Sequence, residues 1–266
     1  MLYLRVISAL IGIPLVLVSV YYGGPWYALL IAVFVNLGLY EYNTILKKRD
    51  YTTPFFFNHL GATLLLIIIY FEQLQLVYPL LMLVFFLLFV TVLFDMEKIS
   101  SADAALSLWG MLYLGGLAGF LLMLRLMPGG ASYTYILLIG VWIHDTAAYF
   151  TGVKWGIRKF APQISPKKSV EGSVAGIGAA VVVFFSVAIL FPDLTGLSPL
   201  QATILALGIA VFAQLGDLLE SALKRQMNVK DSGGLIPGHG GVLDRLDSLL
   251  LAGPFVYYYF QLVNIM

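Results

Sequence analysis

Long apolar runs alternate with short polar breaks along almost the whole chain. A helix needs about 20 apolar residues to cross the hydrocarbon core of a membrane. Runs of that length predict about nine transmembrane helices, at roughly 4–22, 26–46, 54–71, 74–94, 103–126, 133–153, 172–191, 199–223 and 246–264. Glycine, proline and charged residues, which favour turns, fill the breaks. The pattern therefore predicts an all-α, polytopic integral membrane protein.

The composition supports this fold class. The 266 residues are 61% hydrophobic and 11% charged, whereas a soluble domain has about 25% charged residues. The chain has no cysteine, which excludes disulfides and cysteine-ligated zinc. A net charge of +1 gives no indication of a nucleic-acid partner, and none is expected.

The lysines and arginines predict the orientation. With nine spans, only Arg125 of the 15 basic residues falls on one side of the membrane. Because basic residues concentrate in cytoplasmic loops, the crowded side is the cytoplasmic one. This places the N-terminus in the cytoplasm.

The chain changes character near residue 130. Residues 1–130 form apolar helices and are predicted to be a scaffold, with lipid access or oligomer contacts as further roles. Residues 131–266 carry charges inside predicted helices and two cytoplasmic loops, 154–171 and 224–245. We therefore expect the functional site in the C-terminal region. The sequence leaves the oligomeric state open and is compatible with a homodimer.

Three carboxylates inside predicted spans, Asp145, Asp217 and Glu220, are candidate functional groups, because charges at membrane depth are costly. Asp145 and Asp217 lie about 12 Å and about 9 Å from the cytoplasmic ends of their helices, at a rise of 1.5 Å per residue. Matched depth indicates a cation site, and an oxygen-only ligand set suits Mg²⁺, Mn²⁺ or Ca²⁺. The alternative is a structural role against lysine or backbone partners. His144 is expected to form hydrogen bonds rather than to bind the cation.

The loop before the seventh predicted helix is basic and contains the run Ser165-Pro166-Lys167-Lys168-Ser169. Ser169 can cap the helix that follows, which leaves N–H groups and the positive end of the helix dipole at the cytoplasm. Together with Lys167 and Lys168 this predicts an anion site. The alternative is a basic anchor that touches lipid head groups.

The most polar segment of the chain is 221–247. It combines aspartates, basic residues and glycines such as Gly240 and Gly241, whose amides can form anion-binding turns. Carboxylates for a cation, with cations and amides for phosphates, indicate phosphoryl or nucleotidyl transfer. Neither GxxxxGK[ST] nor a GxGxxG motif after a strand is present.

These residues resemble a family signature. The segment resembles the signature of the phosphatidate cytidylyltransferases (CDP-diacylglycerol synthases). The length of the chain resembles that of the shorter bacterial members of this family. The matching positions are Ser221, Lys224, Arg225, Lys230, Asp231, Gly233, Pro237, His239, Gly240, Gly241, Asp244, Arg245 and Asp247. Ser165 to Lys168, followed by Glu171 and Gly172, resembles the family's second motif, with Ser169 where threonine is more usual. The resemblance covers about residues 140–250.

The resemblance implies that CTP and phosphatidate react to CDP-diacylglycerol and pyrophosphate, with Mg²⁺ as cofactor, at the cytoplasmic face of the inner membrane. It implies Asp217 and Asp244 as the first cation ligands, then Asp145 and Asp247. Phosphates would be held by Lys167, Lys168, Lys224, Arg225 and Arg245, and the nucleotide pocket would be shaped by His239, Gly240 and Gly241. The other implied substrate-binding residues are Ser165, Ser169, Glu171, Ser221, Lys230 and Asp231.

Two alternatives remain at this point. A related CTP-dependent enzyme, such as a polyprenol or phytol kinase or a CDP-archaeol synthase, would use a different lipid or transfer a different group. A cation-coupled transporter would use Asp145 and Asp217 as an ion site. The chain shows no internal repeat of the kind that many transporters have, which argues against the second.

Overall fold

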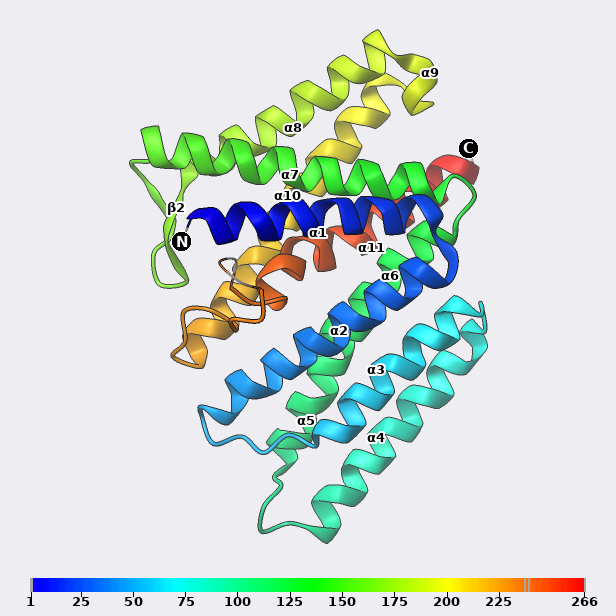
Figure 1. Cartoon of the computed structure of the whole chain (residues 1–266), viewed down its shortest axis with the longest axis vertical. Helices are drawn as coiled ribbons and strands as arrows, with labels where there is room; N and C mark the ends of the chain where they lie inside the picture. Colours follow the sequence, from blue (N-terminus) through cyan, green and yellow to red (C-terminus); the bar gives the residue numbers. More distant parts are fainter. Residues whose placement is uncertain (1, 237, 239, 266) are drawn as a thin grey trace. The chain divides into compact units, whose positions relative to one another are not determined.

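A computed structural model describes residues 2–236, 238 and 240–265. Helices account for most of them (Figure 1). The elements are α1 (Leu2–Tyr22), α2 (Gly24–Lys47), α3 (Phe55–Tyr70), η1 (Leu74–Leu76), α4 (Val77–Phe94), α5 (Ser101–Gly110), η2 (Met111–Gly116), α6 (Leu117–Leu126), α7 (Gly130–Trp155), β1 (Lys159–Ala161), β2 (Ser165–Ser169), α8 (Val170–Leu190), α9 (Pro192–Thr195), α10 (Pro199–Gln226) and α11 (Leu243–Ile265). They form two compact units, residues 1–131 with 224–246, and residues 132–223 with 247–266.

Six helical segments of the described chain are long and apolar enough to cross a membrane: Gly24–Lys47, Leu74–Phe94, Ser101–Leu126, Gly130–Trp155, Val170–Leu190 and Pro199–Gln226. Two further apolar helices, Val6–Tyr22 and Phe55–Tyr70, are shorter. A helix occupies each position where the apolar pattern predicts one. The all-α polytopic class is therefore confirmed, while the count of nine crossings stays a prediction. The division into a scaffold and a functional region near residue 130 also stays a prediction.

In the first unit, α3 packs against α2, α4, α5 and the continuous segment of η2 and α6. Small residues permit this packing, as they do between membrane helices in general. A Cβ atom on Gly115 would lie 2.7 Å from the Cβ atom of Ala62, and one on Gly61 would lie 2.6 Å from the sulfur of Met111. The predicted span 103–126 thus contains a π-helical turn at η2, where Gly115 faces Ala62 of α3.

Arg125, at the end of α6, closes the turn between α1 and α2. Its Nε donates to the carbonyl of Val20 at 2.6 Å, and its Nη2 donates to the carbonyl of Tyr21 at 3.2 Å. These carbonyls belong to the last turn of α1, where no further N–H group of the same helix can donate a hydrogen bond to them. The basic residue that the charge pattern places apart from all the others therefore serves as a helix cap.

In the second unit, α7, α8, α10 and α11 pack through glycine and alanine contacts. Gly176 of α8 lies against His144 of α7, where a Cβ atom would lie 2.8 Å from the ring. Ala206 and Ala210 of α10 are fully buried in one cluster with Ala180 of α8. The backbones of α10 and α11 approach closely, because a Cβ atom on Gly216 would lie 2.2 Å from the carbonyl oxygen of Asp247.

The basic loop before α8 is more ordered than the sequence indicates. Its strands β1 and β2 pair antiparallel, with Lys159 opposite Ser169 and Ala161 opposite Ser165. Ser169 then begins α8, and its Oγ accepts a hydrogen bond from the N–H of Gly172 at 3.1 Å. The predicted helix cap is confirmed, and the segment Ser165 to Ser169 is a strand rather than an irregular loop.

Candidate active site

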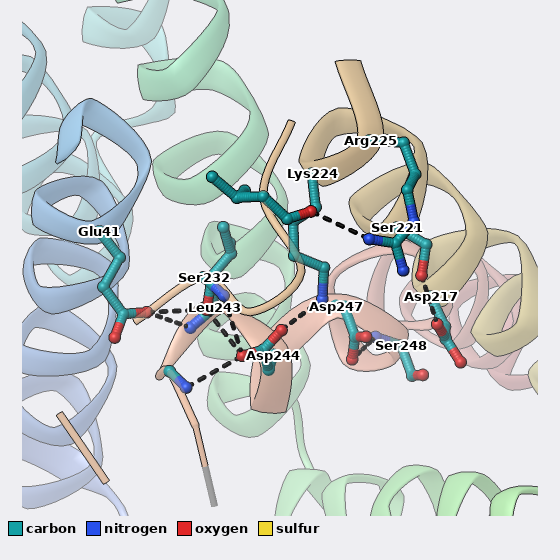
Figure 2. Close-up of polar contacts among 12 residues, drawn as sticks. Glu41, Asp217, Ser221, Lys224, Arg225, Ser232, Leu243, Asp244, Asp247 and Ser248 are labelled. Carbon is teal, nitrogen blue, oxygen red and sulfur yellow. Dashed lines mark hydrogen bonds and ion pairs between the residues drawn. The ribbon is translucent and has the colours of Figure 1, made fainter. Parts of the chain in front are cut away.

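Asp244 is the centre of the polar contacts in the first unit (Figure 2). Its Oδ1 lies 2.5 Å from Nζ of Lys224, near the end of α10. Its Oδ2 accepts hydrogen bonds from the hydroxyl of Ser232 at 2.8 Å and from the N–H of Gly241 at 2.9 Å. The side chain thus holds both ends of the segment 232–241 against the start of α11.

The charge of Asp244 is stabilised by these contacts. Burial raises the pKa of the Asp244 carboxyl, but the hydrogen bonds and charge of Lys224, with the hydrogen bonds from Gly241 and Ser232, lower it to about 2. Charge-assisted hydrogen bonds to the ionised form have this effect. Asp244 is therefore a carboxylate throughout the physiological pH range.

The segment 232–241 also contains a tight turn. The N–H of Ile236 donates to the carbonyl of Gly240 at 3.0 Å. Gly238 and Gly240 have φ angles of 78° and 84°, in the left-handed region that favours glycine. The predicted role of glycine in shaping this backbone is borne out at these two positions. His239, predicted to shape the nucleotide pocket, lies outside the described residues, as does Pro237.

Glu41 of α2 contacts the same segment, and the sequence analysis missed it. The residue is 2% exposed. Its Oε2 accepts a hydrogen bond from the N–H of Leu243 at 2.9 Å and lies 3.3 Å from the hydroxyl of Ser232 (Figure 2). A signal was available, because Glu41 lies inside the predicted span 26–46 and the rule that selected Asp145 applies to it equally.

In the second unit, Asp217 of α10 pairs with Lys168 of β2. The Nζ atom of Lys168 lies 2.6 Å from Oδ2 of Asp217, and the two side chains are 25% and 34% exposed. Ser221, one turn further along α10, donates to Oδ1 of Asp217 at 3.3 Å. The structure therefore brings together three residues that were selected on separate grounds. Lys168 belongs to the second motif, Ser221 to the signature, and Asp217 is the intramembrane carboxylate.

Three polar side chains lie on one face of α10. Gln214, Asp217 and Ser221 follow one another at spacings of three and four residues on this helix. The amide oxygen of Gln214 accepts a short hydrogen bond from the hydroxyl of Ser173 on α8. This bond ties α10 to α8 one turn before the Asp217 position.

The other two candidate carboxylates are also in the second unit. The side chain of Asp145 is 49% exposed, and its Oδ1 lies 3.0 Å from Nδ1 of His144, which is buried. His144 thus forms a hydrogen bond, as expected. Oδ1 of Asp247 accepts a hydrogen bond from the N–H of Ser248 at 2.7 Å. Gly216 lies against the backbone of Asp247, so α10 and α11 cross at this point. Asp217, the next residue after Gly216, and Asp247 therefore both lie at the crossing.

Glu171 has partners in its own loop. Its carboxylate accepts hydrogen bonds from the N–H groups of Ile157 and Arg158, at 3.1 Å for each of the shorter contacts. These bonds tie the start of α8 to the chain that enters the β1–β2 hairpin. The contacts position the hairpin, and the predicted contact of Glu171 with substrate stays a prediction.

The remaining predicted binding residues lie at the surface. Lys167, Arg225, Lys230, Asp231 and Arg245 are exposed, and Ser165 is half-buried. Arg225 donates to the carbonyl of Val229 at 3.0 Å, which closes the end of α10. Exposed cations are accessible to a cytosolic polyanion, so this placement is compatible with the predicted phosphate contacts.

The donor set fits a magnesium ion. Within the described residues, no three or more histidine, cysteine or acidic side chains gather as a ready-made metal cage. Mg²⁺ is usually held by one or two carboxylates together with substrate phosphates and water, rather than by an all-protein cage. In each unit, one aspartate beside a lysine has the chemistry for that kind of binding: Asp244 beside Lys224 in the first, and Asp217 beside Lys168 in the second.

Comparison with known proteins shows the family. The sequence profile of the cytidylyltransferase family matches residues 3–263. A phosphatidate cytidylyltransferase of Synechocystis is 33% identical over 97% of this chain and 96% of its own length. The phosphatidate cytidylyltransferase of Bacillus subtilis is 43% identical, over 51% of this chain and 49% of its own length. That of Haemophilus influenzae is 46% identical, over 49% of this chain and 45% of its own length. The match over nearly the whole chain confirms the resemblance seen in residues 140–250, and the chain belongs to the cytidylyltransferase family.

Proposed function

We propose that this protein transfers the cytidylyl group of CTP to phosphatidate, which yields CDP-diacylglycerol and pyrophosphate. Membership of the cytidylyltransferase family supports a nucleotidyltransferase that uses CTP. The relatives named above are phosphatidate cytidylyltransferases, which supports phosphatidate as the acceptor. A chain built of apolar helices suits a lipid substrate.

The observation that carries the proposal is the pairing of two predicted cation ligands, Asp217 and the signature residue Asp244, with lysines. Lys168 lies 2.6 Å from Asp217, and Lys224 lies 2.5 Å from Asp244. Each pair presents a carboxylate and an ammonium group side by side. In cytidylyl transfer between two anionic substrates, ammonium groups neutralise and orient the phosphates, and carboxylates can hold a divalent cation that does the same.

In the proposed reaction, a phosphate oxygen of phosphatidate attacks the α-phosphorus of CTP. A new P–O bond forms, the bond from the α-phosphorus to the bridging oxygen breaks, and its electron pair leaves with pyrophosphate. The attacking oxygen is already anionic at neutral pH, so no strong general base is required. Lys167, Lys168, Lys224 and Arg245 are proposed to neutralise and orient the phosphates.

Magnesium is the proposed cofactor. Asp217 and Asp244 would hold it, with Asp145 and Asp247 as further ligands. When bound, it would neutralise charge on the triphosphate and on the developing pyrophosphate. The chain's own part is to hold these side chains in place, which the hydrogen bonds of Asp244 and Asp217 support.

We further propose that the site faces the cytoplasm in the inner membrane of a bacterial cell. The distribution of basic residues supports this orientation. A homodimer is the proposed assembly. The chain lacks cysteine, so a single introduced cysteine at a lipid-facing position would report a dimer by crosslinking.

One assay tests the function and separates it from a CTP-dependent lipid kinase. Purified protein is incubated with phosphatidate and CTP that is labelled at either the α- or the γ-phosphate. We expect label from the α-position in the lipid and label from the γ-position in pyrophosphate. Label from the γ-position in the lipid would indicate a kinase, and no lipid label from either position would overturn the proposal.

A further inference from the structure

Glu41 is a buried carboxylate outside both signature motifs. It belongs to α2, whereas its hydrogen-bond partners Ser232 and Leu243 follow 191 and 202 residues later. A carboxyl group at 2% exposure is costly to bury unless hydrogen bonds replace its contacts with water. Here the surroundings are one loop of the signature, so the contact between Glu41 and that loop needs an explanation.

Two signature glycines leave the space that Glu41 fills. A Cβ atom on Gly233 would lie 2.4 Å from Oε1 of Glu41, and one on Gly241 would lie 1.9 Å from the hydroxyl oxygen of Ser232 and 2.5 Å from Oε2 of Glu41. Neither glycine is among those with positive φ angles, so backbone conformation alone would permit a side chain. The carboxylate of Glu41 is therefore a steric reason for glycine at both positions.

Gly234 provides a comparison next to this contact. A Cβ atom on Gly234 would meet nothing within 4 Å. Its φ angle is not positive either. Two adjacent glycines thus differ mainly in their distance from Glu41.

Glu41 is connected to Asp244 through Ser232. The hydroxyl of Ser232 lies 2.8 Å from Oδ2 of Asp244 and 3.3 Å from Oε2 of Glu41. The loop is thereby held between two carboxylates, one at each side of a single hydroxyl (Figure 2). A displacement of Glu41 would move Ser232 and Gly241, which are two of the hydrogen-bond donors to Asp244.

We propose that Glu41 is a positioning residue for the reaction. It fixes the loop Ser232–Leu243 so that Asp244 and the glycine amides are set before substrate arrives. Preorganised charges of this kind cost no rearrangement when the reaction occurs. This role rests on the proposed function where it is tested by turnover. A second test measures the order of the loop directly and needs no substrate.

Substitution of Glu41 tests the role in turnover. Glu41→Gln keeps the size and one oxygen for the N–H of Leu243, whereas Glu41→Leu keeps only the bulk. We expect kcat/KM for CTP to fall about tenfold or more in Glu41→Leu and to stay within about threefold in Glu41→Gln, per folded protein. Equal activity of Glu41→Leu and wild type would overturn the proposal. So would a loss of activity that is fully explained by a smaller amount of folded protein.

A double-mutant cycle keeps the test valid if Glu41→Leu does not fold. Gly233→Ala is expected to lower kcat/KM about tenfold, and Gly234→Ala to leave it within about twofold. In a Glu41→Ala background, which removes the clash, the additional penalty of Gly233→Ala is expected to shrink to within about twofold. Equal penalties in both backgrounds would contradict a steric contact between Glu41 and Gly233.

Cysteine labelling measures loop order without substrate. The chain has no cysteine, and Val242, next to Leu243 in the loop, is 3% exposed. In a Val242→Cys protein, we expect Glu41→Ala to raise the rate of maleimide modification about tenfold, because local opening exposes the thiol. An unchanged rate would overturn the proposal even in an active enzyme.

The two proposals fail in distinguishable ways. If wild-type protein forms no CDP-diacylglycerol while labelling of Val242→Cys depends on Glu41, the proposed function is wrong and the loop contact stands. If wild-type protein is active and neither labelling nor turnover depends on Glu41, the proposed function stands and the positioning role is wrong.

Discussion

The ammonium nitrogen of Lys224 lies 2.5 Å from Oδ1 of Asp244, and the two side chains are only 11% and 12% exposed. A pair this enclosed is worth little as a net gain but is costly to break, because the remaining charge loses its partner. Another ion pair of the first unit, Lys98 with Asp95, is open to solvent, with side chains 75% and 44% exposed. The contrast gives a matched pair of substitutions.

Lys224→Met is expected to lower the free energy of unfolding by about 2–4 kcal/mol, because Asp244 stays behind without its ammonium partner. Lys98→Met is the control and should change it by less than about 0.5 kcal/mol. Unfolding of detergent-solubilised protein by heat or denaturant measures both. Similar values for the two variants would show that the Lys224 pair is not enclosed in solution.

The stability contributed by Asp244 should depend on pH in a defined window. Its pKa is about 2 in the folded protein, against an ordinary value of 3.8. Since the folded value is the lower one, the stabilisation is complete above pH about 4 and is lost as the pH falls through about 2. The wild-type advantage in unfolding free energy over Asp244→Asn should be constant from pH 7 to about 4, at about 2 kcal/mol, and shrink below that. An advantage that declines already between pH 7 and 5 would contradict the assignment.

Lys168 should matter for turnover far more than for stability. Its pair with Asp217 is 25% and 34% exposed, and pairs this open contribute about 1 kcal/mol or less to stability. We expect Lys168→Met to lower CDP-diacylglycerol formation about tenfold or more, because one phosphate-neutralising charge is lost. Lys159→Met, at an exposed position of β1 in the same hairpin, is the control and should retain activity. A large loss of stability in Lys168→Met would point to a structural pair instead.

The crossing of α10 and α11 should not tolerate a methyl group at Gly216. A Cβ atom there would lie 2.2 Å from the carbonyl oxygen of Asp247, which belongs to the backbone and has no rotamer to change. We expect Gly216→Ala to destabilise the protein by about 1–3 kcal/mol and to lower activity, since Asp217 and Asp247 lie at the crossing. Gly178→Ala is the matched helical control, because nothing lies within 4 Å of its Cβ position. It should be neutral or stabilising by up to about 1 kcal/mol.

The helices could be predicted, and Asp217 could be singled out as a candidate, because each depends on a local pattern. An apolar run reports a span directly, and Asp217 stands out because it is a carboxylate within such a run. The cap at Ser169 also follows from its position at the start of α8. None of these features requires knowledge of which helices are neighbours.

The contacts made across the chain could not be predicted in the same way. The pairing of Lys168 with Asp217 joins a strand and a helix that lie far apart in sequence. The strands β1 and β2 are only 3 and 5 residues long and carry no alternating pattern. Glu41 lies outside the two motifs that carry the family resemblance, and its partners follow far later in the chain. Its role becomes visible only when the loop is seen packed against α2.

The burial of Glu41 also has a consequence for the order of events during synthesis. The residue leaves the ribosome long before Ser232 and Leu243, which follow 191 and 202 positions later. At about 5–20 residues per second this delay is roughly 10–40 seconds. Throughout that interval the carboxylate lacks its final partners, so the end of α2 must stay hydrated while most of the remaining helices enter the membrane. The first unit is therefore completed by one of the last segments to be translated.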